Sequence, residues 1–158
     1  KGRTAAMRLV SEVLAAGETR RGTDIAGALR FLNNVQKRRA VVFLISDFIA
    51  AGYEQELRVT ARHHDIVCCT VTDPRESSLP DAGLIEVQDP ETGAVYLVDT
   101  ASRRVREEFA RNAREDMARI TTTLRRMRID AIDVATDQPF VDNVHRLFRQ
   151  RQLRAGRG

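Results

Sequence analysis

Two oxygen-bearing side chains stand where a parallel sheet could bring them together. Thr23 precedes an amphipathic helical pattern, and Asp47 follows the apolar run Val41–Ser46. In an open α/β sheet, ligands bind outside the carboxyl ends of the strands. Hydroxyl and carboxylate oxygens at such an edge are the donors that Mg²⁺ and other hard cations prefer. The spacing therefore indicates an oxygen-rich site at one edge of the sheet, with Thr23 and Asp47 as candidate metal ligands.

Three further polar residues belong to the same predicted edge. Asp24 and Ser46 are the sequence neighbours of the two candidate ligands, and Asp73 ends the next apolar run. We expect these three residues to contribute to a partner surface. A simpler interpretation stays open, in which Thr23 caps its helix, a contribution of about 1 kcal/mol. In that interpretation Asp47 accepts hydrogen bonds from nearby amides and Asp73 forms a turn with Pro74.

The elements that would position these residues follow from apolar periodicity. Helical patterns cover residues 4–15, 25–35, 53–63, 102–127 and 140–148, and strand patterns cover residues 41–46, 66–72, 84–88, 94–98 and 131–135. Alternation of strands and helices predicts a three-layer α/β fold with a mainly parallel sheet. The pair 84–88 and 94–98, joined by turn residues, is an inserted β-hairpin. The uninterrupted apolar run 41–46 predicts a strand that is covered on both faces.

The composition is that of a globular domain. The chain has 158 residues, a formal net charge of +4 and 42% hydrophobic residues, and it contains no apolar run of the roughly 20 residues that span a bilayer. Cys68 and Cys69 are adjacent in a predicted strand and point to opposite faces, so we expect no disulfide and a cytoplasmic location. Residues 1–150 are predicted to form the domain, and the basic residues 151–158 a disordered tail.

The motifs Thr23-Asp24-Ile25 and Leu44-Ile45-Ser46-Asp47-Phe48 carry a family resemblance. The chain resembles the C-terminal half of a von Willebrand factor A-type domain and, more narrowly, the bacterial domain of unknown function 58. The resemblance implies a Rossmann-like sheet with three further strands before the first residue. It also implies a magnesium-dependent adhesion site, to which Thr23 and Asp47 would contribute. The Asp-x-Ser-x-Ser motif of such sites is missing, so we expect Mg²⁺ in the intact protein but not in this chain.

The resemblance further implies a function. It indicates a non-enzymatic protein-interaction module that acts with a MoxR-type AAA+ ATPase or its client. The uncovered edge of strand 41–46 would allow homo-oligomers. Two alternatives stay open, namely a phosphoryl-transfer or hydrolytic enzyme that uses Asp47, and nonspecific nucleic-acid binding through the arginine-rich tail. No motif indicates sequence-specific recognition of nucleic acid.

Overall fold

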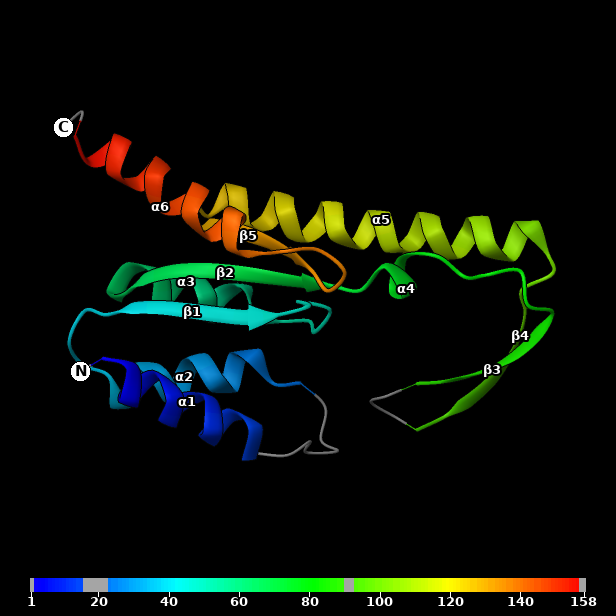
Figure 1. The fold of residues 1–158 in the computed structure, drawn as a ribbon, viewed down its shortest axis with the longest axis horizontal. Helices are drawn as coiled ribbons and strands as arrows, with labels where there is room; N and C mark the ends of the chain where they lie inside the picture. The colour runs from blue at the N-terminus through cyan, green and yellow to red at the C-terminus, as the bar shows by residue number, and fades with distance from the viewer. Residues whose placement is uncertain (1, 16–22, 90–92, 157–158) are drawn as a thin grey trace.

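The computed structural model describes residues 2–15, 23–89 and 93–156, which form six helices and five strands (Figure 1). The helices are α1 (Arg3–Ala15), α2 (Ile25–Val35), α3 (Glu54–His63), α4 (Pro74–Ser77), α5 (Arg103–Arg126) and α6 (Val141–Ala155). The strands are β1 (Val41–Ser46), β2 (Asp65–Thr72), β3 (Leu84–Gln88), β4 (Val95–Asp99) and β5 (Asp130–Ala135). Within the described ranges, no helix is long and apolar enough to cross a membrane.

The strands form two separate sheets. The larger sheet has the order β1-β2-β5, with β2 parallel to both neighbours. The smaller sheet is the antiparallel hairpin β3-β4, which lies beyond the carboxyl ends of the parallel strands (Figure 1). The predicted α/β fold with a mainly parallel sheet and an inserted hairpin is therefore confirmed. Helix α4 was not predicted.

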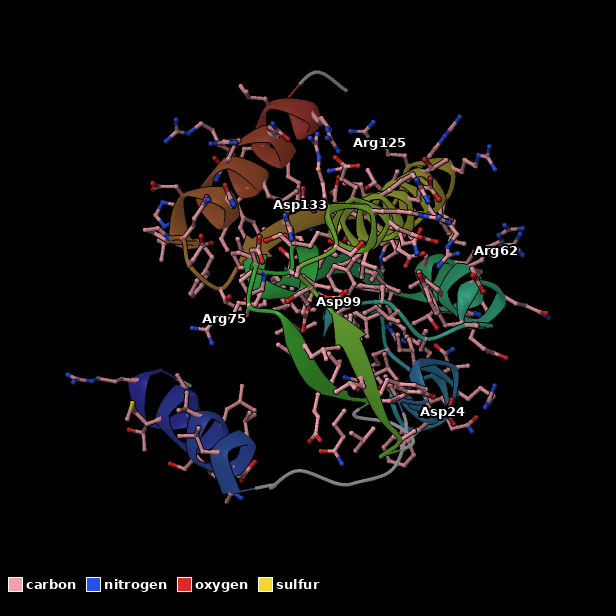
Figure 2. All side chains as sticks on the ribbon, turned by 90° about the vertical axis from the view of Figure 1, so that its right-hand side faces the viewer. Asp24, Arg62, Arg75, Asp99, Arg125 and Asp133 are labelled. Atoms are coloured by element: carbon pink, nitrogen blue, oxygen red, sulfur yellow. The ribbon has the colours of Figure 1, made fainter. Side chains whose placement is uncertain are left out.

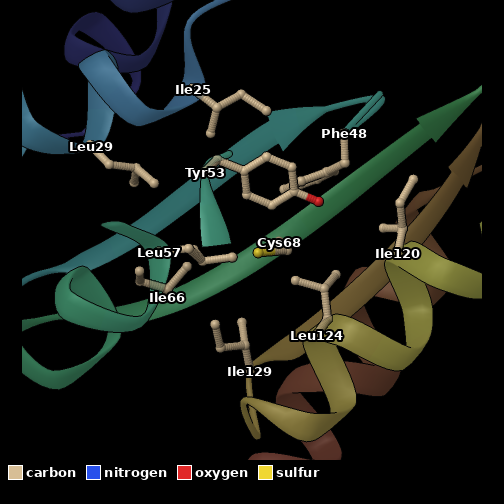
Figure 3. Close-up of a cluster of buried hydrophobic side chains, with 10 residues drawn as sticks. All are labelled: Ile25, Leu29, Phe48, Tyr53, Leu57, Ile66, Cys68, Ile120, Leu124 and Ile129. Atoms are coloured by element: carbon tan, nitrogen blue, oxygen red, sulfur yellow. The ribbon is translucent and has the colours of Figure 1, made fainter. Parts of the chain in front are cut away.

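The main core lies between the parallel sheet and the helices α2, α3 and α5. Leu57 of α3, Cys68 of β2 and Leu124 of α5 point into one cluster and are at most 2% exposed (Figure 3). Full burial of a leucine side chain is worth roughly 1.5–3 kcal/mol. These contacts fix the sheet against its first helical layer.

A second, smaller core lies between the sheet and α6. Val67 and Cys69 of β2 contact Ile132 of β5 and Leu147 of α6. Cys68 and Cys69 thus face opposite layers, and both are free and buried, as expected. Burial, with a smaller contribution from Cys69, raises the pKa of the Cys68 thiol to about 12, so this thiol remains protonated and unreactive at neutral pH.

Strand β1 is covered on one face and exposed on the other, which corrects the prediction that both of its faces are covered. Val42 and Leu44 pack against the main core. Val41, Phe43 and Ile45 point to the other face and are 56%, 45% and 67% exposed. On that face α6 covers β2 and β5, and its Phe148 ring approaches Phe43 with a centroid distance of 6.4 Å.

Helix α1 also presents apolar residues that are not packed. No residue of α1 is buried, and Figure 2 shows the helix apart from the sheet, on the same side as α6. The structure therefore leaves two apolar surfaces uncovered, one on β1 and one on α1.

The predicted disordered tail is wrong for residues 151–155, because α6 continues to Ala155. Arg151 donates two hydrogen bonds to the carboxylate of Asp65, at 2.8 and 2.9 Å, and one to Asp130 at 2.7 Å. Arg154 binds the second oxygen of Asp130 at 2.9 Å. These two aspartates stand at the amino ends of β2 and β5, so their charges hold the last turns of α6 against the sheet. Residues 157–158 lie outside the described part of the chain.

We expect Arg151→Met to lower the free energy of unfolding by about 2 kcal/mol at neutral pH, since hydrogen bonds between charged groups are lost from a mostly buried site. Urea denaturation measures this change. Arg149→Met is the matched control, because Arg149 is exposed on the same helix. Equal stability of the two variants would show that the Arg151 contacts do not hold α6.

The same contacts predict a pH dependence. Partial burial alone would raise the pKa of Asp130, but hydrogen bonds from Arg151 and Arg154 outweigh it and lower the pKa of this carboxyl. A lowered pKa in the folded state stabilises the protein above the unfolded value of about 3.9, and this stabilisation is lost as the pH falls through the folded value. The stability difference between wild type and Arg151→Met should therefore shrink below about pH 4.

Candidate functional site

The predicted polar edge lies at the carboxyl ends of the parallel strands. Helix α2 begins at the end of the sheet where β1 finishes (Figure 1). Ile25, the first residue of α2, and Phe48, which follows β1, belong to the same buried cluster (Figure 3). The residues just before them, Asp24 and Asp47, are therefore placed at one edge of the sheet. We call this edge, with Thr23, Asp24, Ser46, Asp47 and Asp73, the rim.

The start of α2 corrects the interpretation of Thr23 as a helix cap. The N-cap is Asp24, whose carboxylate accepts a hydrogen bond from the amide of Gly27 at 2.7 Å. A Cβ atom on residue 27 would collide with that carboxylate, which explains the glycine. Asp24 also lies 4.0 Å from Arg30. Thr23 is exposed, and its hydroxyl forms no hydrogen bond to any residue that the structure describes.

Asp47 shapes the loop after β1. Its Oδ1 accepts hydrogen bonds from the amide of Ile49 at 3.2 Å and from the hydroxyl of Ser46 at 3.3 Å. The Ser46 hydroxyl in turn accepts a hydrogen bond from the amide of Phe48 at 3.1 Å. The simpler interpretation, in which Asp47 accepts hydrogen bonds from nearby amides, thus holds for its Oδ1. Its Oδ2 has no partner within the described ranges, and the residue is exposed.

Phe48 directly follows Asp47 of the rim, and sequence reasoning missed its role. Its φ of 60° is left-handed, a conformation that costs a side-chain-bearing residue roughly 1–2 kcal/mol. Its ring is 2% exposed and lies 5.6 Å from the ring of Tyr53. Burial of this ring and the Ser46 hydrogen bond hold the loop in place. No residue type in the sequence signals this turn, since glycine or asparagine would be the usual choice.

A hollow with both apolar and charged walls, the latter from Glu54 and Arg119, adjoins this loop. A cavity of about 260 Å³ lies between the loop after β1 and α5, and Phe48, Ile49, Tyr53 and Ile120 line it. Ile49 is 63% exposed beside the Asp47 carboxylate. The rim therefore combines exposed charge with apolar surface.

Asp73 has a different surrounding from the other rim residues. Its Oδ1 accepts a hydrogen bond from the Arg75 amide at 2.8 Å and caps α4, while its Oδ2 accepts one from the Thr136 hydroxyl at 3.2 Å. Asp73 thus joins the ends of β2 and β5. In Figure 2, which looks toward the rim, Asp24 lies below α3 and Arg75 lies on the side of α6. The structure does not gather Asp73 with Asp24.

Magnesium binding at the rim stays a prediction. Mg²⁺ requires about six oxygen ligands in octahedral geometry. Thr23 and Asp47 offer one hydroxyl and one carboxylate, and the described residues contain no group of three or more His, Cys, Asp or Glu side chains that could hold a metal ion. Thr23 and Asp47 remain predicted ligands of a site that needs further donors.

The comparison with known proteins gives the family. Residues 1–119 match the family described as "Protein of unknown function DUF58". An uncharacterized protein of Mycobacterium avium is 30% identical over 130 residues, which are 82% of this chain and 76% of that protein. Uncharacterized proteins of Mycobacterium tuberculosis and Mycobacterium bovis are 31% identical over 132 residues. This chain belongs to the DUF58 family.

The aligned residues make up 82% of this chain but only 41% of the length of the Mycobacterium tuberculosis and Mycobacterium bovis relatives. No solved structure matches it. The activity and partners of the whole protein are therefore matters for proposal.

We expect the chain alone to bind Mg²⁺ weakly or not at all, because the rim offers too few oxygen ligands. Isothermal titration with MgCl₂ measures this binding for the wild type and for Asp47→Asn. Asp137→Asn is the control, since Asp137 is an exposed aspartate in the turn after β5. Saturable binding that Asp47→Asn abolishes and Asp137→Asn preserves would contradict the expectation.

Proposed function

We propose that this chain is a non-enzymatic protein-interaction module of von Willebrand A type, which binds a MoxR-type AAA+ ATPase or its client. The observation that carries the proposal is the exposed apolar face of β1, where Val41, Phe43 and Ile45 stand in a row. Large apolar side chains grouped on a surface are typical of sites that bind other proteins.

The edge of β1 adds to this argument. β1 is the outer strand of the parallel sheet and pairs with β2 alone among the described strands. Its other edge therefore offers amide and carbonyl groups to a further strand, which is a common way for a sheet to bind another polypeptide. An added strand would extend the sheet and bury apolar side chains from β1 on the same face.

Helix α1 offers a second apolar surface. Met7, Val10, Val13 and Leu14 follow a helical period and are 57%, 50%, 67% and 79% exposed. An amphipathic helix is marginally stable by itself, and most of its stability comes from packing its apolar stripe against another element. A partner that covers β1 from the α6 side would approach the side on which α1 lies (Figure 2).

The rim would contribute charge to the same interaction. Asp24 and Asp47 are exposed, and Asp47 lies beside Ile49, so both carboxylates can meet donors or cations on a partner. Mg²⁺ takes part only if the partner or another segment supplies the remaining oxygen ligands. In that case Thr23 would bind through its hydroxyl and Asp47 through its carboxylate.

The test is direct binding between this protein and the MoxR-type ATPase of the same organism, measured by calorimetry. We expect Ile45→Lys to weaken binding at least tenfold, because a charge at the centre of an apolar contact must be desolvated. Phe31→Lys is the matched control, since Phe31 is 68% exposed on α2, on the other side of the sheet. Unchanged affinity of Ile45→Lys would contradict the proposal.

The role of the rim is tested separately with Asp47→Ala and with EDTA. Loss of binding in both cases would place a metal ion in the contact. Binding that persists in both cases would remove the metal while leaving the apolar surface as the interaction site.

A further inference from the structure

A cavity of about 160 Å³ lies at the amino ends of the parallel strands, opposite the rim. Its walls come from the segments before β1, β2 and β5 and from α6. The side chains that matter for its chemistry are Arg39, His64, Asp65, Arg128, Asp130 and Arg151. The proposed interaction surface does not use these residues.

His64 is the most unusual residue of this cavity. It follows α3 directly and is 3% exposed. Neither ring nitrogen has a hydrogen-bond partner within the described ranges. A neutral imidazole carries one donor and one acceptor, and buried polar atoms are nearly always satisfied in folded proteins. The unpaired ring therefore indicates a ligand or ordered water in the cavity.

The charge of the cavity indicates which kind of ligand it can bind. Both oxygens of Asp65 are bound by Arg151, and the oxygens of Asp130 are bound by Arg151 and Arg154. The acidic groups are thus already neutralised by arginines. Arg39 and Arg128 form no ion pair with any residue that the structure describes, and both are exposed at the cavity. The free charge at the cavity is positive.

Arg128 is held at the cavity by a fixed turn. Its φ of 56° reverses the chain between α5 and β5. The turn is closed by hydrogen bonds from the amide of Arg128 to the carbonyl of Arg125, at 3.0 Å, and from the amide of Ile129 to the carbonyl of Leu124, at 3.1 Å. Ile129 is 9% exposed in the main core, which anchors the turn.

We propose that this cavity binds the phosphate group of a small ligand, with Arg39 and Arg128 as charged donors and the His64 ring as a buried hydrogen-bond donor. Phosphate fits because it presents several acceptor oxygens to donors that come from three segments. Arginine suits this role through the paired donors of its guanidinium group. The group comes from inorganic phosphate or from a phosphomonoester.

The probes are inorganic phosphate and glycerol 3-phosphate, added to the wild-type protein at constant ionic strength. Titration is followed by the NMR signals of the His64 ring and by calorimetry. We expect saturable shifts of the His64 signals with at least one probe. Tighter binding of glycerol 3-phosphate would identify an organic phosphate as the ligand, and tighter binding of inorganic phosphate would identify the free ion. A His64 ring whose signals do not move with either probe would overturn the proposal.

Variants distinguish phosphate binding at this site from nonspecific attraction of phosphate to an arginine-rich protein. We expect Arg39→Gln and Arg128→Gln each to weaken phosphate binding about tenfold or more, because each removes a charge-assisted hydrogen bond. Arg104→Gln is the matched control, since Arg104 is exposed near the opposite end of α5 and should leave the affinity unchanged. His64→Phe keeps a ring in the core and should also weaken binding. Equal affinities of Arg39→Gln, Arg128→Gln and Arg104→Gln would overturn the proposal, whether or not His64→Phe folds.

Discussion

The structure depends on β2. Among the described strands, it is the one with a parallel neighbour on each side and helices on both faces. Its central residues Val67, Cys68 and Thr70 are at most 2% exposed. A strand buried on both faces fixes the layer of α2, α3 and α5 on one side and α6 on the other. Strand β1 lies outside full coverage, because α6 packs against β2 and β5 and approaches β1 through the Phe148 ring near Phe43.

Different interactions stabilise the two ends of this sheet. At the rim, carboxylates and a hydroxyl accept hydrogen bonds from backbone amides that follow them closely in the chain, so polar residues there mostly shape local turns and helix starts. At the amino ends, Arg151 joins Asp65 to Asp130 and ties α6 to the sheet. Partial burial strengthens these ion pairs relative to the exposed pairs on α5, which contribute little. The rim therefore remains available for contacts, whereas ion pairs hold the amino ends of β2 and β5 against α6.

Element order, parallel pairing and the hairpin could be predicted from the sequence, because they depend on local periodicity and turn residues. The failures have physical reasons. The apolar run 41–46 shows that its residues favour burial, but not that another element is present to cover Val41, Phe43 and Ile45. Thr23 and Asp24 are both good caps, and only the start of the helix at Ile25 selects Asp24. Arg151 looked like part of a basic tail because its partner Asp65 is 86 residues away. The left-handed Phe48 and the unpaired His64 depend on packing that no local pattern encodes.

The central claim is that β1 is an incomplete edge strand that a protein partner completes. Hydrogen exchange of the amides in residues 41–46, compared with those in residues 65–72, tests it most directly. The account predicts that β1 exchanges faster than β2 in the free protein, because one edge of β1 is open to solvent, and that bound ATPase protects it. Equal protection of both strands in the free protein, or no added protection of β1 in the complex, would contradict the claim.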